Sequence, residues 1–155
     1  MDLKLKLART EDAEQIWKMQ IEAFSELYAR YQDTDTSPAA EPLEKTVWRL
    51  QFPSTFYYLI LADGETAGAI RVIDHKDGVT PKRISPLFVL PAFRNKGIAQ
   101  KAILAAEEIH GSNNWCLDTI LQEKGNCHLY EKMGYRSTGE TKAVNDKLTL
   151  IWYKK

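Results

Sequence analysis

The sequence predicts a fold of the α/β (α+β) class, in which one mixed sheet, antiparallel in its first half, has helices on both faces. Two observations support a single domain of this class. Strand and helix patterns follow one another in the order β, α, α, three strands, then α, β, α, β, β, which implies one sheet between helices. The 155 residues contain no repeats or long linkers, which predicts a single domain over residues 1–155 that buries about 70% of its unfolded surface.

The first part of the chain predicts one strand and two helices. Leucine and lysine alternate over residues 3–7, as in a half-buried strand. Apolar residues then recur at helical spacing up to about Tyr31, and Thr10 is the expected cap of this helix. A second, shorter helix is predicted from about Pro42 to Leu50, since proline is tolerated in a first helical turn.

Three strands follow in the middle of the chain. The apolar run 56–62 and its partner over 66–74 are separated by Asp63-Gly64, a strong hairpin signal. A turn at residues 75–78 then leads to the buried central strand around 87–90. These strands predict the antiparallel half of the sheet.

The last part of the chain alternates between helices and strands. A helix opens at Gly97 with an apolar side and stops at Gly111, and the apolar side contains Ile98, Ala102, Ala105 and Ile109. The remaining predicted elements are a strand at 115–120, a helix at 126–133 that ends at Gly134, and strands at 135–138 and 148–153. The apolar Trp152-Tyr153 end fits either a final core strand or contact with a second copy in a homodimer.

Composition excludes several classes of function. Apolar residues make up 44% of the chain, and the net charge is zero, so no electrostatic attraction to nucleic acid is expected. No stretch has the length of a membrane span or the apolar region of a signal peptide, which predicts a cytoplasmic protein. Cys116 and Cys127 have no metal-type spacing, and Pro38 stands where a calcium loop beginning at Asp33 needs glycine. We therefore expect no metal.

The stretch Ile84–Gly111 combines a strand, a basic turn and a helix start. Pro91 ends the strand because it lacks an N–H for the ladder, and the basic turn Ala92–Lys96 follows. First-turn N–H groups have no intrahelical partners, and the helix dipole adds positive charge there. Gly97 leaves room for a phosphate, and the guanidinium of Arg94 suits phosphate oxygens. This arrangement predicts a ligand with a diphosphate, held largely by main chain.

Two motifs narrow the identity of this ligand. Neither the nucleotide loop G-x-x-x-x-G-K-[ST] nor the dinucleotide fingerprint G-x-G-x-x-G is present. Arg94-Asn95-Lys96-Gly97-Ile98-Ala99 instead resembles the R/Q-x-x-G-x-G/A signature of the GNAT N-acetyltransferase superfamily. Asn126-x-x-Leu129-Tyr130-Glu131-Lys132-Met133-Gly134-Tyr135 resembles a later segment of the same family.

This resemblance covers essentially the whole chain. It implies a GNAT-like mixed sheet, largely antiparallel, with six to seven strands. It also implies transfer of an acetyl group from acetyl coenzyme A to a primary amine of a small molecule or peptide, by direct attack in a ternary complex. The residues that it assigns to coenzyme binding are Phe88, Val89, Leu90, Arg94, Asn95, Lys96, Gly97, Ile98, Ala99, Gln100 and Asn126.

The resemblance further assigns catalysis to Tyr130, as the acid that protonates the departing thiolate. A phenol with a pKa near 10 stays protonated at neutral pH and can supply this proton. The alternative is a packed helix residue whose hydroxyl binds water. A module that senses acyl coenzyme A without catalysis is the alternative function, because the central strand carries no carboxylate that could act as base.

The acceptor site and the general base are less defined. Glu22 and Glu26 lie one turn apart on the first long helix and could face the acceptor, together with Tyr28 or Tyr31. A solvated charged face explains the two glutamates equally well. His75 and a base acting through water remain further alternatives.

Overall fold

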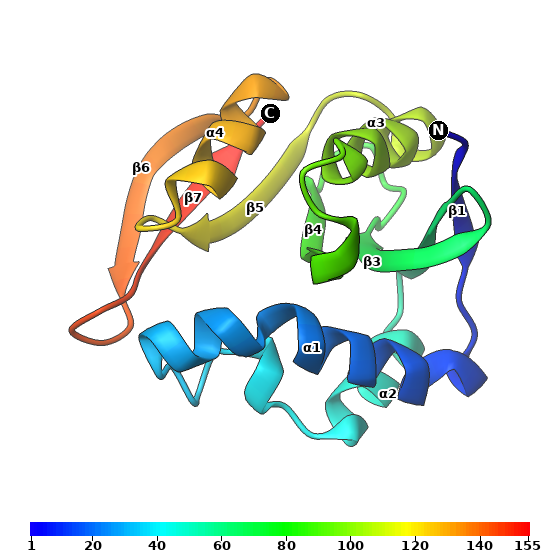
Figure 1. The fold of residues 1–155 in the computed structure, drawn as a ribbon. Coiled ribbons are helices and arrows are strands. Elements are labelled where there is room, and N and C mark those ends of the chain that lie inside the picture. Colours follow the sequence, from blue (N-terminus) through cyan, green and yellow to red (C-terminus); the bar gives the residue numbers. More distant parts are fainter.

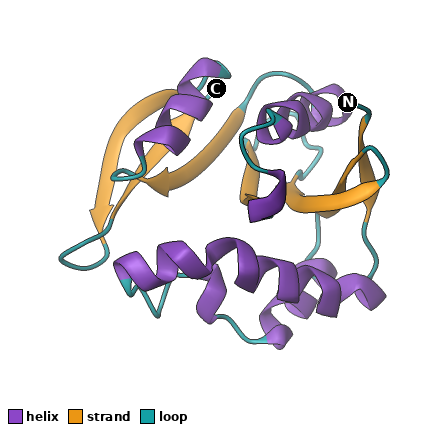
Figure 2. Ribbon diagram, in the orientation of Figure 1, coloured by secondary structure: helices purple, strands orange, loops and turns teal.

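Seven strands form one sheet in the order β1-β2-β3-β4-β5-β7-β6 in the computed structural model, which describes residues 1–155 (Figures 1 and 2). The strands are β1 (Leu3–Leu7), β2 (Thr55–Ala62), β3 (Glu65–Ile73), β4 (Lys82–Val89), β5 (Trp115–Ile120), β6 (Arg136–Ala143) and β7 (Thr149–Lys154). The helices are α1 (Ala13–Tyr31), α2 (Leu43–Gln51), α3 (Ile98–His110) and α4 (Lys124–Lys132). The predicted class, element order and single mixed sheet are confirmed.

One strand pair gives the sheet its mixed character. All neighbouring strands are antiparallel except β4 and β5, which are parallel and pair only through Lys82 with Trp115 and Arg83 with Cys116. Beyond these residues β4 and β5 have no common register, and Figure 1 shows them diverging from each other. The sheet is therefore divided at its centre into an N-terminal part and a C-terminal part.

Two hydrophobic cores lie on opposite faces of the sheet. Side chains of α3 and α4, including Ile98, Ile103 and Tyr130, belong to the larger core. Side chains of α1, including Ile16, pack with Phe88 of β4 on the other face. In Figure 1 the blue α1 and cyan α2 accordingly run along the side of the sheet opposite to α3. Helices cover both faces, as predicted.

The apolar side of α3 differs from the prediction. Ile98 and Ala102 are buried, but Ala105 is only half-buried and Ile109 is 56% exposed. The buried positions are instead Ile98, Ala102, Ile103 and Ala106, because this row packs against the sheet. The predicted helical period of α3 is correct, but the buried face is rotated by about one residue from the predicted face.

Several element ends differ as well. The carboxylate of Asp12 accepts the Arg9 N–H at 2.8 Å before α1, so the expected cap by Thr10 is wrong. β4 begins at Lys82 rather than near Leu87, because Ile84 already pairs with Val72 of β3. β6 runs to residue 143 rather than 138, and all its side chains are exposed, so it lacks the apolar alternation that predicts a strand.

The predicted hairpin and the C-terminal strand are confirmed. Asp63 and Gly64 both have positive φ, at 50° and 84°, as a tight hairpin requires. Tyr153 is 2% exposed and belongs to the larger core, so β7 is a core strand. No helix has both the length and the apolar character that crossing a membrane requires.

Candidate active site

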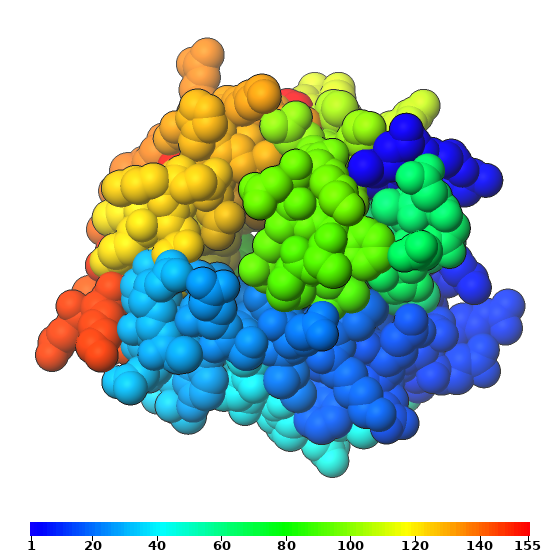
Figure 3. All heavy atoms as spheres, in the orientation of Figure 1, coloured from blue at the N-terminus to red at the C-terminus, as the bar shows by residue number.

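A cleft of about 780 Å³ opens where β4 and β5 diverge. It is bordered by α1 and the connection to α2, by the start of α3, and by α4. Figure 3 shows a hollow between the blue α1 segment, the green α3 segment and the yellow α4 segment. The cleft is therefore lined by residues 84–89, by the turn and first residues of α3, up to Gln100, and by the segment around Tyr130.

The start of α3 presents a row of main-chain donors to this cleft. The N–H groups of residues 95–100 have no hydrogen-bond partner, and the first bond of the helix runs from Lys101 N–H to Gly97 O at 3.1 Å. Asn95 and Gly97 have φ of 62° and 75°, which turns successive N–H groups into a concave arrangement. A Cβ on Gly97 would meet no atom within 4 Å, so the space in front of it is open. Such a row of N–H groups binds anions.

Arg94 does not take the predicted role of a phosphate fork. Its Nη2 donates to Ala23 O of α1 at 2.7 Å, and its Nε donates to Val89 O of β4 at 3.1 Å. Its Nη1 lies 3.9 Å from the Glu26 carboxylate. The side chain of Arg94 therefore links α1 to the end of β4, and the other basic side chain of the motif, Lys96, is exposed and lies over the Phe93 ring.

Only some of the predicted main-chain contacts on β4 are available. Leu90 N–H donates to Ala67 O of β3 at 2.8 Å, and the antiparallel alternation then directs the N–H of Phe88 to Ala69. The expectation that Phe88 and Leu90 offer their N–H groups to a ligand is therefore wrong. The main-chain N–H groups of Leu87 and Val89 face the other way, toward the cleft that forms where β4 and β5 diverge.

Tyr130 lies on α4 at the wall of the cleft. It is 9% exposed, and its ring packs against Tyr135 and Tyr153 with centroids 5.8 and 6.4 Å apart. No protein group hydrogen-bonds the Tyr130 hydroxyl. Burial raises the pKa of this hydroxyl well above its usual value, and the charge of Asp118 adds to the shift. The group therefore stays protonated at neutral pH. Asn126, one turn earlier, also lines the cleft.

The structure brings one of the four predicted acceptor residues to the cleft. Glu26 lines it, whereas Glu22 is exposed and lies outside the lining. Tyr28 is hydrogen-bonded to the Thr34 hydroxyl at 3.1 Å, and the Tyr31 hydroxyl donates to the Glu123 carboxylate. Glu22, Tyr28 and Tyr31 do not line the cleft, so Glu26 is the one predicted acceptor residue whose side chain borders it.

Three ion pairs in the cleft were missed by the sequence analysis. Asp118 of β5 pairs with Arg83 of β4, and Glu123 pairs with Arg30 at 2.7 Å. Glu41 holds Arg49 through two bonds of 2.7 and 2.6 Å. Each of the first two pairs joins segments that are far apart in the sequence. The third pair joins Arg49 of α2 to Glu41, which lies just before that helix. Asp118 lies on the strand that follows the central one, and this position is the one signal in the sequence for a carboxylate at the site.

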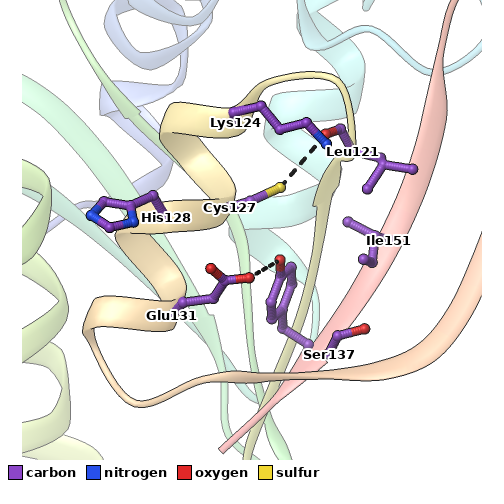
Figure 4. A pocket seen from close by; sticks show the side chains of 8 residues that line it. Leu121, Lys124, Cys127, His128, Glu131, Ser137 and Ile151 are labelled. Carbon is purple, nitrogen blue, oxygen red and sulfur yellow. Dashed lines mark hydrogen bonds between the residues drawn. The ribbon is translucent and has the colours of Figure 1, made fainter.

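A second, smaller cavity of about 390 Å³ lies on the other side of α4, against β5 and β7 (Figure 4). Glu131 accepts the Tyr153 hydroxyl at 3.0 Å, which holds α4 on β7. The thiol of Cys127 lies near main-chain oxygens, and His128 is turned away from it. Cys127 is therefore a buried free thiol, and its side chain diverges from that of His128.

Comparison with known families identifies the family to which this chain belongs. The sequence profile of the acetyltransferase (GNAT) family matches residues 14–135. The chain belongs to the GNAT acetyltransferases. This match includes the row of donors at α3 and the Tyr130 segment, and it confirms the family predicted from the two motifs. No curated protein matches this GNAT acetyltransferase.

Solved structures match nearly the whole chain. An acetyltransferase from Thermus thermophilus is 17% identical over 99% of this chain and 96% of its own, with a TM-score of 0.74. The PaiA N-acetyltransferase from Thermoplasma acidophilum, in complex with coenzyme A, is 16% identical over 100% of both chains, with a TM-score of 0.71. The spermidine N-acetyltransferase from Vibrio cholerae, in complex with coenzyme A and spermine, is 14% identical over 97% and 93%, with a TM-score of 0.75. These similarities establish the fold.

Proposed function

We propose that this GNAT acetyltransferase is an N-acetyltransferase that moves the acetyl group of acetyl coenzyme A to a primary amine. The observation that carries the proposal is the row of six unpaired N–H groups at residues 95–100, in the same cleft as the Tyr130 hydroxyl. The likeness to two N-acetyltransferases crystallised with coenzyme A supports this choice of cosubstrate.

The residues present fit the coenzyme. Its pyrophosphate is an anion with several acceptor oxygens, and it suits the N–H groups of residues 95–100 and the charge of Lys96. Its pantetheine arm carries amides, which suit the outward-facing main chain of Leu87 and Val89 and the side-chain amide of Asn126. The thioester then lies in the part of the cleft between β4 and α4.

The chemistry requires two proton movements. The amine nitrogen attacks the thioester carbonyl and forms the new C–N bond, and the tetrahedral intermediate then breaks its C–S bond. Tyr130 gives its hydroxyl proton to the departing sulfur, so the thiol of coenzyme A leaves as a neutral group. The amine loses its proton to a carboxylate of the cleft, directly or through water, and Glu26, Asp118 and Glu123 are candidates because they line the cleft.

The test is the exchange Tyr130→Phe, which removes the proton donor and leaves the ring. We expect turnover with an accepted amine to fall about 10²-fold or more, while the affinity for coenzyme A stays close to wild type. Tyr135→Phe is the matched control, because Tyr135 packs on Tyr130 and its buried hydroxyl has no partner. It should retain wild-type turnover.

Two outcomes would contradict the assignment. Wild-type turnover in Tyr130→Phe would show that another group protonates the thiolate. Binding of acetyl coenzyme A without acetyl transfer to any amine would instead favour the alternative, a non-catalytic sensor of acyl coenzyme A.

A further inference from the structure

One buried arginine beside the cleft has no carboxylate partner. Arg71 of β3 is 6% exposed, and its Nε donates to the main-chain oxygen of Ser85. Its Nη1 is closed off from solvent and has no hydrogen-bond partner. Its Nη2 also has no hydrogen-bond partner, but this atom is not closed off from solvent. Guanidinium donors that are buried and unpaired are costly, so native structures rarely keep them without a reason.

The surroundings of Arg71 do not neutralise it. Arg49 and Glu41 form a closed pair, and Arg83 is paired with Asp118. Of these three arginines, only Arg71 forms no ion pair with a carboxylate. Burial lowers the pKa of Arg71 to about 10, and the charge of Arg49 adds to the shift. The guanidinium is still ionised at neutral pH.

A second donor without a partner lies beside this charge. Tyr57 of β2 is opposite Arg71 in the β2–β3 register, and both side chains lie on the face of the sheet that α1 covers. The Tyr57 hydroxyl is buried with no hydrogen-bond partner, and burial raises its pKa, so it keeps its proton. Arg71 and Tyr57 thus form one cluster of unused donors.

This cluster lies next to the acceptor end of the cleft. Arg71 and Tyr57 are not themselves part of the cleft lining, but Ser85, which Arg71 contacts, lines the cleft, as do Glu41 and Arg49. Ser85 precedes Val89 by four residues on β4, which corresponds to roughly 13 Å along a strand. The cluster is therefore on the far side of the thioester position from the donors at residues 95–100.

We propose that the acceptor is an amino acid, and that Arg71, assisted by Tyr57, binds its carboxylate. This inference rests on the proposed function for the amine that is acetylated. A carboxylate would supply the missing negative charge and accept the unused donors. A polyamine offers no acceptor to these donors, and it would bring further positive charge beside an arginine that has no counter-ion.

The remaining unpaired acid of the region does not neutralise Arg71. Asp33 lines the cleft and accepts the Thr36 hydroxyl at 2.8 Å. It forms no ion pair with Arg71 or with any other cation of the region. A carboxylate in the lining suits the ammonium of a zwitterion, which agrees with an acceptor of both charges.

The test compares amino acids with the amines left by their decarboxylation, for example lysine with cadaverine, ornithine with putrescine and tyrosine with tyramine. The quantity measured is the preference, defined as the ratio of kcat/KM for the amino acid to that for the amine. We expect the wild type to prefer the amino acid by at least about tenfold in the accepted pair, because the amine leaves buried donors unpaired. Arg71→Met should lower this preference about 10²-fold, and Arg71→Lys should restore part of it.

A matched control and a measurement of folding keep the test decisive. Arg136→Met removes an exposed arginine of β6 that has no ion pair, and it should keep the wild-type preference. Melting followed by circular dichroism should give Arg71→Met a melting temperature equal to or above wild type, because the exchange removes an unpaired buried charge.

The outcomes separate this inference from the proposed function. A wild type that acetylates the decarboxylated amines as well as the amino acids overturns the inference and leaves the proposed function intact, even if Arg71→Met does not fold. An unchanged preference in folded Arg71→Met also overturns the inference. A folded wild type that acetylates no amine overturns the proposed function, and the inference with it.

Discussion

The guanidinium of Arg94 shows how a motif residue can serve the fold rather than the ligand. It donates to the main chain of α1 at Ala23 and of β4 at Val89. Both acceptors are main-chain oxygens that few other side chains could reach at once. The first residue of the R-x-x-G-x-A motif thus positions α1 beside the cleft, and the ligand-facing donors are those of the following main chain.

We expect Arg94→Met to destabilise the protein by about 1–3 kcal/mol, because two hydrogen bonds from a charged donor are lost. Lys96→Met is the control, since Lys96 is exposed and contacts only the face of the Phe93 ring, 5.7 Å from its centroid. It should leave the free energy of unfolding nearly unchanged. Denaturant titration measures both, and an Arg94→Met variant as stable as wild type would contradict the role given to this side chain.

Residues of the site were predictable where a local motif contains them. Gly97 and Tyr130 each belong to a short pattern, and both line the cleft. Arg71, Asp118 and Glu41 were not predictable, because their significance depends on partners from other elements. No spacing along the chain indicates that Arg71 lacks a carboxylate, since this is a property of the packed structure.

At the scale of elements, the close contact between β3 and β4 holds the cleft wall in place. Gly68 lies opposite Val89, and a Cβ built on it would meet Phe88 O at 2.0 Å. This distance involves main chain, which cannot move without shifting β4. The absence of a side chain at residue 68 therefore determines how closely the two strands approach at the base of the site.

We expect Gly68→Ala to destabilise the protein by about 1–3 kcal/mol or more, because the methyl group overpacks the strand pair. Gly125→Ala is the control within α4, where the new Cβ would meet no atom within 4 Å. This exchange should stabilise by about 0.5–1 kcal/mol, because alanine favours helix. Thermal melting of both variants decides, and a Gly68→Ala protein as stable as wild type would contradict the account of this contact.

Helices and strands were predicted well where their own sequence pattern is strong. They were predicted less well where packing against neighbouring elements determines their bounds or their buried face. The hairpin at Asp63-Gly64 and the stop of α3 at Gly111 rest on local backbone chemistry and are correct. The exposed strand β6 has no apolar alternation, so its length follows only from pairing with β7. The buried face of α3 differs from the prediction because not every apolar residue of this helix is buried, and Leu104 and Ile109 are exposed.

For the molecule as a whole, the fold class followed from the order of elements, but the cleft did not. The order β, α, α, three strands, α, β, α, β, β is compatible with an unbroken sheet, and sequence does not reveal that β4 and β5 pair over only two residue pairs. This short pairing is what opens the centre of the sheet. The cleft then combines the start of α3, the free edge of β4 and Tyr130, which are distant in sequence.

The central claim is that the start of α3 binds the pyrophosphate of coenzyme A, and calorimetry tests it most directly. Acetyl coenzyme A is titrated into wild type, Gly97→Glu and Gly78→Glu. The two glycines have φ of 75° and 73° and open space at the Cβ position, so both exchanges bring similar backbone strain and the same charge. Gly78 lies in the turn between β3 and β4, outside the cleft.

We predict micromolar binding in wild type and in Gly78→Glu, and loss of binding in folded Gly97→Glu, because the new carboxylate repels the pyrophosphate. Binding of wild-type strength in Gly97→Glu, or no binding by a folded wild type, would contradict the account.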